Sequence, residues 1–439
     1  GSLERGCTGC HSESRYPQLM TTASAHSVDP ILLENRLLEL SSSRSFFALY
    51  TSQGYDSKWG EYELLFAWGA KAVFDTDALK NGALDNGWRF GFLGYELRHE
   101  FERLAKGNPA IGQWPQAQFF EPEVVGTLDK AGNLTVFADT PAAALAAVLE
   151  PAKGGDVGNT ILDFQPVESR ESYLEAVRDL QEHIQYGDIY EVNYCTAFMA
   201  EYSALDSAQL FKQMAQATKA PFSAYVKMDQ LELLCTSPER YILKKGDQLW
   251  SQPIKGTNRR LTENNHVQER LLVADEKERA ENVMIVDLVR NDLSRVAAKG
   301  TVQVEELFGV YPFKNVNQMI STVTCKTRPE TSNWDILKAT FPMGSMTGAP
   351  KISAMELAER YEKTERGIYS GALGYVKPNG DFDFNVVIRS IALDGKQGIA
   401  SAHVGGAITI LSVPEREYEE CLLKAESLLQ SAAGRDSQH

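Results

Sequence analysis

The chain has 439 residues, 43% of them hydrophobic, and a formal charge of −15. This length exceeds one average domain and predicts two domains or one large α/β unit. An acidic chain without a basic run is a poor binder of nucleic acid or of an anionic membrane. It also lacks the run of about 18 apolar residues that predicts a membrane span.

The first residues carry a motif that we set apart from the fold. Cys7, Cys10 and His11 spell C-x-x-C-H, the haem-attachment pattern. No export signal accompanies it, and no further zinc ligands lie nearby. We interpret residues 1–20 as a tag or tail. The remaining cysteines are scattered singly, which is typical of a reduced, cytoplasmic protein.

The first half is predicted to be rich in strands. Aromatic and branched runs at 45–50 and 88–95 are bounded by turn residues, and an Ala-rich helix follows over 140–150. Pro151–Asp156 has the composition of a linker. We therefore expect an N-terminal variable subdomain at 21–165 and a second subdomain at 166–435.

The second half alternates helices and strands. An apolar stripe from Tyr173 to Ile184 predicts a helix that Ser172 caps and Gly187 ends, before a strand at 189–194. Further helices are predicted at about 275–294, 351–363 and 415–430, and strands at 371–376, 386–392 and 398–402. This alternation predicts a mixed α/β fold.

Two of these helices carry carboxylates at helical spacing. Glu278 and Glu281 share one face, as do Glu417, Glu420 and Lys424 on the last helix. Taken alone, each set is better explained as a solvated charged face. If the two helices converge, their carboxylates form an oxygen site suited to Mg²⁺, which leaves positions open for an anionic ligand.

Two turns carry further candidates. Gly344–Lys351 contains small residues and opens a helix, where free amides favour an anion, although a tight connector explains it equally well. Lys255 lies in a turn that also holds Arg259 and Arg260. Nearby cations and burial lower the pKa of a lysine, and a neutral amine is a nucleophile. Without other knowledge, Lys255 is interpreted as a surface lysine.

Five motifs in order resemble the chorismate-utilising enzymes: anthranilate, aminodeoxychorismate, isochorismate and salicylate synthases. The motifs are Ser237–Arg240, Pro253–Thr257, Ala280–Asp292, Gly344–Lys351 and Glu417–Lys424. The match covers about 169–430, and 21–166 is similar to the variable N-terminal part of the two aminating types. The resemblance implies the complex α/β (α+β) sandwich of the anthranilate synthase type, with antiparallel-rich sheets and flanking helices.

The resemblance implies a role for each matched residue. Glu281 and Glu420 would bind Mg²⁺, supported by Glu278 and Glu417, and the ion would hold the ring carboxylate of chorismate. The other substrate contacts would come from Arg389, Tyr369, Thr347, Gly405, Lys424 and Gln318. Glu239 would protonate the leaving C4 hydroxyl, which requires a raised pKa.

Position 255 selects the subtype within the family. The family carries alanine there in anthranilate synthases and lysine in aminodeoxychorismate synthases. Lys255 therefore implies attack at C2 with loss of the C4 hydroxyl. Ammonia would then add at C4 and expel the lysine, giving 4-amino-4-deoxychorismate. Anthranilate synthase component I is the nearest alternative.

The chain departs from the family pattern at two positions. Aminating members more often carry glutamine where this chain has Glu191, and most relatives carry histidine where it has Gln318. These departures motivate a third hypothesis, a catalytically silent binding subunit that kept the fold.

The resemblance also implies partners. We find no cysteine in a Gly-x-Cys-x-Gly elbow and no lyase domain. A separate glutaminase subunit would therefore supply ammonia, and a separate lyase would convert the product to 4-aminobenzoate for folate.

Overall fold

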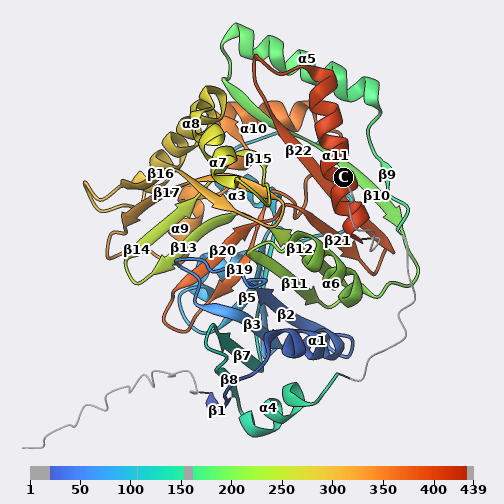
Figure 1. The fold of residues 1–439 in the computed structure, drawn as a ribbon, viewed down its shortest axis with the longest axis vertical. Helices are drawn as coiled ribbons and strands as arrows, with labels where there is room; N and C mark the ends of the chain where they lie inside the picture. Colours follow the sequence, from blue (N-terminus) through green and yellow to red (C-terminus); the bar gives the residue numbers. More distant parts are fainter. Residues whose placement is uncertain (1–19, 106, 153–161, 433–439) are drawn as a thin grey trace, which may run out of the picture.

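The computed structural model describes residues 20–105, 107–152 and 162–432. Two large sheets form its centre (Figure 1). Every strand pair in them is antiparallel. The predicted mixed fold with antiparallel-rich sheets and flanking helices is therefore confirmed. The C-x-x-C-H motif lies outside the described residues.

Sheet A has 12 strands. Their spatial order is β1 (Thr21–Ala25), β8 (Leu134–Ala138), β7 (Val124–Asp129), β3 (Tyr62–Trp68), β2 (Phe46–Thr51), β11 (Phe222–Met228), β12 (Leu231–Ser237), β21 (Ser390–Asp394), β22 (Ile399–Ile408), β10 (Glu191–Glu201) and β18 (Gly348–Ala349), with β9 (Gln165–Pro166) paired to β10.

Sheet B has 10 strands. Their order is β15 (Ile254–Arg259), β17 (Val316–Lys326), β14 (Gln248–Gln252), β13 (Arg240–Lys245), β20 (Phe382–Val386), β19 (Ala372–Val376), β5 (Arg89–Leu93), β6 (Ala117–Glu121) and β4 (Ala72–Phe74), with β16 (Gln303–Pro312) paired to β17.

Helices lie around these sheets. They are α1 (Pro30–Ser41), α2 (Thr76–Ala78), α3 (Arg98–Phe101), α4 (Pro141–Leu149), α5 (Arg170–Tyr186), α6 (Ser207–Thr218), α7 (Asn265–Ala274), α8 (Glu276–Ser294), α9 (Asn333–Thr340), α10 (Lys351–Tyr361) and α11 (Pro414–Ala432), with short turns η1 (Leu79–Ala83), η2 (Tyr95–Leu97) and η3 (Gly344–Met346). Helix α8 packs on β15 and β17, whereas α11 lies against β22, α5 and α6 (Figure 1).

Both halves of the sequence contribute to both sheets. In sheet A, β2 from the first half pairs with β11 from the second. In sheet B, β5 pairs with β19. A buried cluster containing Ala48 and Leu65 of sheet A and Phe90 and Phe92 of sheet B fills the space between the sheets. The boundary predicted near residue 165 thus divides the sequence but not the sheets.

Two local predictions need correction. The cap of α5 is Ser169, whose hydroxyl accepts a hydrogen bond from the Ser172 amide, so the helix begins one turn earlier than predicted. The predicted strand at 386–392 is interrupted, because β20 of sheet B ends at Val386 and β21 of sheet A begins at Ser390. The link passes from one sheet to the other, and Arg389 turns the chain with φ +49°.

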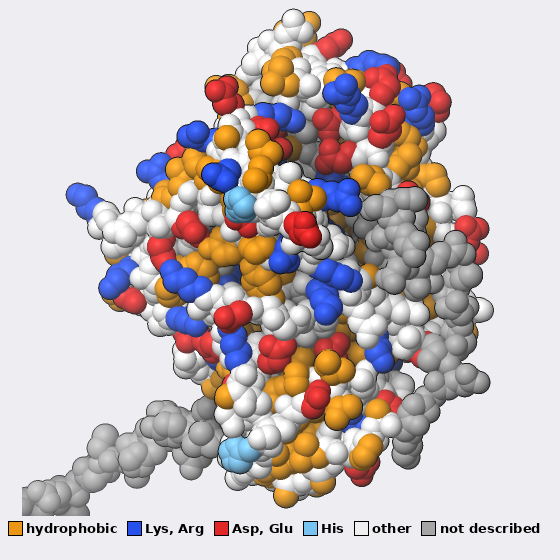
Figure 2. Space-filling model, viewed as in Figure 1, with side chains coloured by type: hydrophobic (Ala, Val, Ile, Leu, Met, Phe, Trp, Pro, Cys, Tyr) orange, Lys and Arg blue, Asp and Glu red, His pale blue; other side chains and the backbone are white. Residues whose placement is uncertain are grey.

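The charged surface agrees with the sequence composition. On the face shown in Figure 2, Lys and Arg side chains are scattered among acidic and uncharged ones rather than gathered into one basic patch. Across the described ranges, no helix combines the length and apolar character needed to span a membrane.

Candidate active site

Two segments that cross between the sheets lie side by side and carry two predicted site residues. Glu239 lies between β12 of sheet A and β13 of sheet B, and Arg389 lies between β20 and β21. The Val386 amide donates to the Glu239 carbonyl at 3.0 Å, and the Thr236 amide donates to the Arg389 carbonyl at 3.0 Å. These backbone bonds bring together positions that are 150 residues apart in sequence (389 − 239).

The neighbouring Arg240 anchors this crossing. Its guanidinium makes a two-pronged contact with Asp383, at 2.9 and 3.0 Å, and donates to Gln252 at 2.7 Å. Such forked pairs fix geometry as well as adding energy. The arginine of the Ser237–Arg240 motif is thus a structural anchor that holds Glu239 in place.

Glu239 is buried, with 5% of its surface exposed. Burial raises the pKa of its carboxyl to about 7, because a charged carboxylate loses hydration there, while Ser345 and Lys255 oppose the shift. A substantial fraction of the side chain is therefore protonated near neutral pH. This is the direction that a general acid requires.

Lys255 lies on β15 at the edge of sheet B, and its ammonium pairs with a carboxylate from sheet A. Its Nζ donates to Oε1 of Glu191 at 2.8 Å, and the two side chains are 13% and 8% exposed. The interpretation as a surface lysine is therefore wrong. Pairing across the two sheets could not be read from residues 64 apart in sequence.

The charge environment of Lys255 also differs from the prediction. Burial acts to lower its pKa, but Glu191, Glu281 and Glu239 outweigh burial and raise it above the ordinary lysine value. The expected lowering by neighbouring cations is therefore wrong. Arg260, one of those cations, points its guanidinium at the Phe313 carbonyl at 2.7 Å.

Asn282 fixes α8 against the strand that carries Lys255. It is fully buried, its amide donates to the Lys255 carbonyl at 3.1 Å, and its carbonyl accepts from the Ser321 hydroxyl at 2.5 Å. The next residue towards the helix start, Glu281, is therefore held close enough to Lys255 for each to shift the pKa of the other.

The carboxylates of α8 are partly buried and repel one another. Burial raises the pKa of Glu278, and Glu281 raises it further. Burial likewise raises the pKa of Glu281, with Glu191 and Glu417 of α11 adding to the shift while Lys255 opposes it. The charge of Glu417 on α11 is thus felt at Glu281 on α8.

Helix α11 presents its charged face to β22. Lys424 donates to the Gly405 carbonyl at 3.0 Å and pairs with Glu420 at 2.7 Å. A side chain at position 405 would not fit, since a Cβ there would lie 2.7 Å from Sγ of Cys195. Gly405 therefore allows β22 to lie close to β10 beside this helix.

Among the described residues, the predicted magnesium ligands do not form a closed cage. In the part of the chain that the structure describes, no three of Glu278, Glu281, Glu417 and Glu420 bring ligand oxygens within 4.8 Å of one another. Their oxygens are nevertheless the hard donors that Mg²⁺ prefers, and a cation would relieve the repulsion that raises the pKa of Glu278 and Glu281. The residues present therefore fit the ion.

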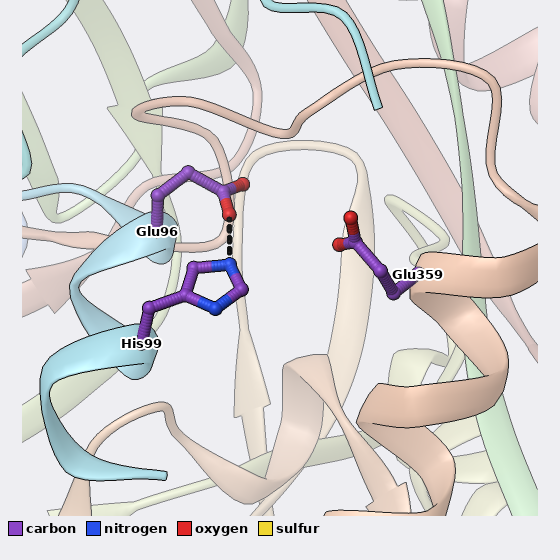
Figure 3. Close-up of side chains that lie close together, drawn as sticks. All are labelled: Glu96, His99 and Glu359. Carbon is purple, nitrogen blue, oxygen red and sulfur yellow. Dashed lines mark ion pairs between the residues drawn. The ribbon is translucent and has the colours of Figure 1, made fainter. Parts of the chain in front are cut away.

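A tighter cluster of potential ligands lies elsewhere. Figure 3 shows Glu96 and His99, from η2 and α3, facing Glu359 of α10. Arg98 donates to Glu96 at 3.1 Å and also to Glu359, so its guanidinium already supplies positive charge between the two carboxylates. We interpret this cluster as an internal ion-pair network.

The small-residue turn is fixed to both α8 and β10. Lys351 donates to Asp292 and to the Pro342 carbonyl at 2.9 Å, and the Thr347 carbonyl accepts from the Asn193 amide at 2.7 Å. Gly348 has φ +149°, and a Cβ there would lie 2.2 Å from the Glu191 carbonyl. The turn thereby brings buried Thr347 beside the strand of Glu191.

The remaining predicted contacts are placed separately. Tyr369 stacks on His403, with ring centroids 5.5 Å apart, and Gln318 faces Thr257 across β17 and β15. Arg389 has an exposed side chain, yet enough protein surrounds it that desolvation lowers its pKa. Among the described residues, no side chain forms an ion pair or hydrogen bond with its guanidinium. Such a cation is available to an anionic ligand.

Three residues that position the site were not predicted as part of it. Glu191 was noted only as a departure, and Asn282 lay inside a matched motif without a role. Arg366 gave no signal, yet it donates to the Met346 carbonyl at 2.7 Å and to the Asn193 carbonyl at 2.8 Å. It therefore ties the small-residue turn to β10.

Comparison with known proteins identifies the family and the fold of this chain. A family model described as chorismate binding enzyme matches residues 49–430. Aminodeoxychorismate synthase component 1 of Escherichia coli is 37% identical over 354 residues, covering 78% of this chain and 76% of that protein. Anthranilate synthase component 1 of Thermus thermophilus is 35% identical over 356 residues, with coverage of 78% and 76%.

A solved structure shares the fold. The crystal structure of anthranilate synthase component I from Streptococcus pneumoniae superimposes with a TM-score of 0.74 at 24% identity, covering 97% of this chain and 95% of that one. The family predicted from the five motifs is thereby confirmed. The chain belongs to the chorismate-binding enzymes.

Proposed function

We propose that this protein aminates chorismate at C4, giving 4-amino-4-deoxychorismate through a covalent bond to Lys255. The observation that carries the proposal is the position of Lys255: it is buried and lies among Glu191, Glu239 and Glu281. The similarity to an aminodeoxychorismate synthase component 1 over three quarters of both chains supports the same assignment.

Lys255 and Glu239 divide the chemistry between them. The neutral amine of Lys255 would attack C2 of chorismate, both conjugated double bonds of the ring would shift by one position away from C2, and the C4–O bond would break. Hydroxide is a poor leaving group, so the protonated carboxyl of Glu239 would donate its proton and water would depart. Ammonia would then attack C4, both double bonds would shift back, and the C2–N bond to the lysine would break and release its neutral amine.

The acidic helices would hold Mg²⁺, with Glu281 and Glu420 as ligands and Glu278 and Glu417 supporting them. The bound ion would neutralise the ring carboxylate of chorismate. Without positive charge, this cluster of carboxylates would repel a dianionic substrate. Lys424 currently pairs with Glu420, and we expect it to turn towards the substrate when the cation arrives.

Further residues would bind and orient the substrate. The guanidinium of Arg389, which has no ion-pair or hydrogen-bond partner among the described residues, would offer a fork for the enolpyruvyl carboxylate, and Tyr369 would contact the same carboxylate. The remaining contacts would come from Thr347, Gly405, Lys424 and Gln318. The buried Gln318 carbonyl oxygen has no hydrogen-bond partner among the described residues, so it is available to accept one from a ligand.

Ammonia would come from a separate glutaminase subunit, and the product would serve 4-aminobenzoate and folate synthesis. The name component 1 of the Escherichia coli relative supports a partner component. We also propose a cytoplasmic location. Cys195, Cys235, Cys325 and Cys421 are free and buried, as in a reducing compartment.

The test is to incubate the protein with chorismate, ammonium and Mg²⁺ and to identify the product by mass and by coupling to a lyase. We expect 4-amino-4-deoxychorismate. Direct formation of anthranilate would overturn the subtype. The 35% identity to the Thermus thermophilus anthranilate synthase favours that alternative, whereas Lys255 argues against it.

A catalytically silent binding subunit is the second alternative. The chain retains Glu239, Lys255, Glu281, Arg389 and Glu420 at the positions where the resemblance implies functional residues, which argues against it. Turnover that requires Mg²⁺ and is lost in Glu281→Gln would exclude a silent subunit.

A further inference from the structure

The Lys255–Glu191 contact joins the two sheets at the site. Glu191 begins β10 of sheet A, and Lys255 lies on β15 of sheet B, so neither residue is a local neighbour of the other. Both side chains are largely shielded from water, and the Nζ–Oε1 distance is 2.8 Å. A proton can therefore pass between these two atoms without a bridging water.

The second oxygen of Glu191 is unusual. Oε2 is buried and has no hydrogen-bond partner in the described part of the chain. Leaving a buried carboxylate oxygen unpaired costs stability, so such a group calls for an explanation. A structural ion pair would be better served by a carboxylate with both oxygens bonded.

A lysine nucleophile in this site has to lose a proton first. The charged groups that act on Lys255 are the carboxylates of Glu191, Glu239, Glu278 and Glu281, and all of them stabilise its ammonium form. Of these, only Glu191 is within hydrogen-bonding distance of Nζ among the described residues. In a site shielded from water, the neutral acid and amine are less disfavoured relative to the ion pair than they are in water.

We propose that Glu191 is the proton acceptor that converts Lys255 into a nucleophile. The proposal rests on the proposed function. An N–H bond of the Lys255 ammonium breaks and an O–H bond forms at Oε1 of Glu191. The nitrogen keeps the electron pair with which it attacks C2. When ammonia later releases the neutral lysine, the proton returns from Glu191 to Nζ and the ion pair is restored.

This role separates glutamate from glutamine at position 191. Both side chains offer an oxygen at the same place, so both can position the lysine. Only glutamate can take up its proton. In this chain the proton would stay within the pair, whereas a protein with glutamine there would have to release it to solvent.

The experiment compares Glu191→Gln with the wild-type protein by the rate of chorismate adduct formation at Lys255 between pH 6 and 9. Below about pH 7, where Glu239 is mostly protonated, the wild-type rate should vary little, because the pair retains one proton. The variant should fall at least about tenfold at pH 7, and below the pKa of its lysine it should lose about tenfold per pH unit. An equal rate and an equal pH profile in both proteins would overturn the proposal.

Labelling with acetic anhydride gives a second readout that needs no chorismate. Loss of the Glu191 charge should lower the pKa of Lys255, so the variant should be acetylated faster at Lys255 at pH 8 while its adduct rate at pH 7 falls. Lys351, which pairs with Asp292, is the internal control and should react equally in both proteins. A purely positional Glu191 would not move the two readouts in opposite directions.

The two proposals can fail separately. If the wild-type protein produces no aminated chorismate, the proposed function is wrong. The acetylation experiment alone then tests whether Glu191 exchanges a proton with Lys255. Faster acetylation of Lys255 in Glu191→Gln would support Glu191 as its proton partner, and equal acetylation would overturn it. Circular dichroism of the variant, which differs by one isosteric side chain, checks that the fold is kept.

Discussion

Lys255 and Lys351 are both largely buried lysines that pair with a carboxylate, yet their surroundings differ. Their side chains are 13% and 12% exposed. Lys351 donates to Asp292 and also to the carbonyls of Pro342 and Thr340. The ammonium of Lys255 has Glu191 as its one hydrogen-bond partner in the described part of the chain. Each N–H group of the Lys351 ammonium has an acceptor. Among the described residues, the Lys255 ammonium has an acceptor for only one of its N–H groups.

The charges around the two lysines differ as well. Burial lowers the pKa of Lys351, and Asp292 does not fully offset it. At Lys255, burial acts in the same direction, but the surrounding carboxylates outweigh it and the pKa is raised. Around Lys351, one buried cation is paired with one buried carboxylate, and this pair fixes the small-residue turn. The surroundings of Lys255 carry surplus negative charge, which is where a cation and an anionic substrate can be accommodated.

The largest effect is expected from the variant that tests whether Lys255, and not Lys351, is the nucleophile. Lys255→Ala should form no covalent adduct when the protein is given chorismate and Mg²⁺ without ammonia, and its amination rate should fall by orders of magnitude, because the nucleophile is gone. Intact-protein mass spectrometry reports the adduct. Lys351→Met is the matched control and should still form it. An unchanged adduct on Lys255→Ala would exclude Lys255 as nucleophile.

Removal of the cation should have the next largest effect. Chelation with EDTA should abolish amination and added Mg²⁺ should restore it, because the acidic site otherwise repels the substrate. Glu417→Gln should raise the Mg²⁺ concentration for half-maximal rate by about 10- to 100-fold, and Glu281→Gln should raise it further. Full activity in EDTA would contradict the proposal that a cation must neutralise the acidic residues before the substrate binds.

The raised pKa of Glu239 predicts a pH dependence. The carboxyl donates a proton only when protonated, and its pKa is about 7. The amination rate should therefore decline as the pH rises above about 7, provided that ammonia is supplied at a constant concentration of its neutral form. Glu239→Gln should reduce the rate by about 10²- to 10⁴-fold and remove this limb. If the rate of the variant still declined above about pH 7, the decline would belong to a group other than Glu239.

Lys351→Met should have the smallest effect on catalysis and a clear effect on stability. It leaves Asp292 buried without its cation, which costs about 3–5 kcal/mol of unfolding free energy. Urea unfolding followed by circular dichroism measures the loss. The amination rate per folded molecule should change little. A large rate loss with unchanged stability would mean that Lys351 belongs to the site rather than to the scaffold.

The sequence predicted the local elements well where neighbours decide them. The helices α5, α8 and α11 lie where apolar spacing and Gly187 indicated, since periodicity and capping act within a few residues. The strand predicted at 386–392 failed because residues 387–389 cross from one sheet to the other. Nothing in a short apolar run reveals which sheet its two ends will join.

For the site, the sequence by itself determined which residue types are present and in what order: the acidic pairs, Glu239, Lys255 and the small-residue turn. It did not determine their surroundings. The partner of Lys255 is Glu191 of the other sheet, and the shielding that raises the pKa of Glu239 comes from distant segments. Only the tertiary structure decided these features, because hydrogen bonding and loss of hydration depend on contacts between residues far apart in the chain.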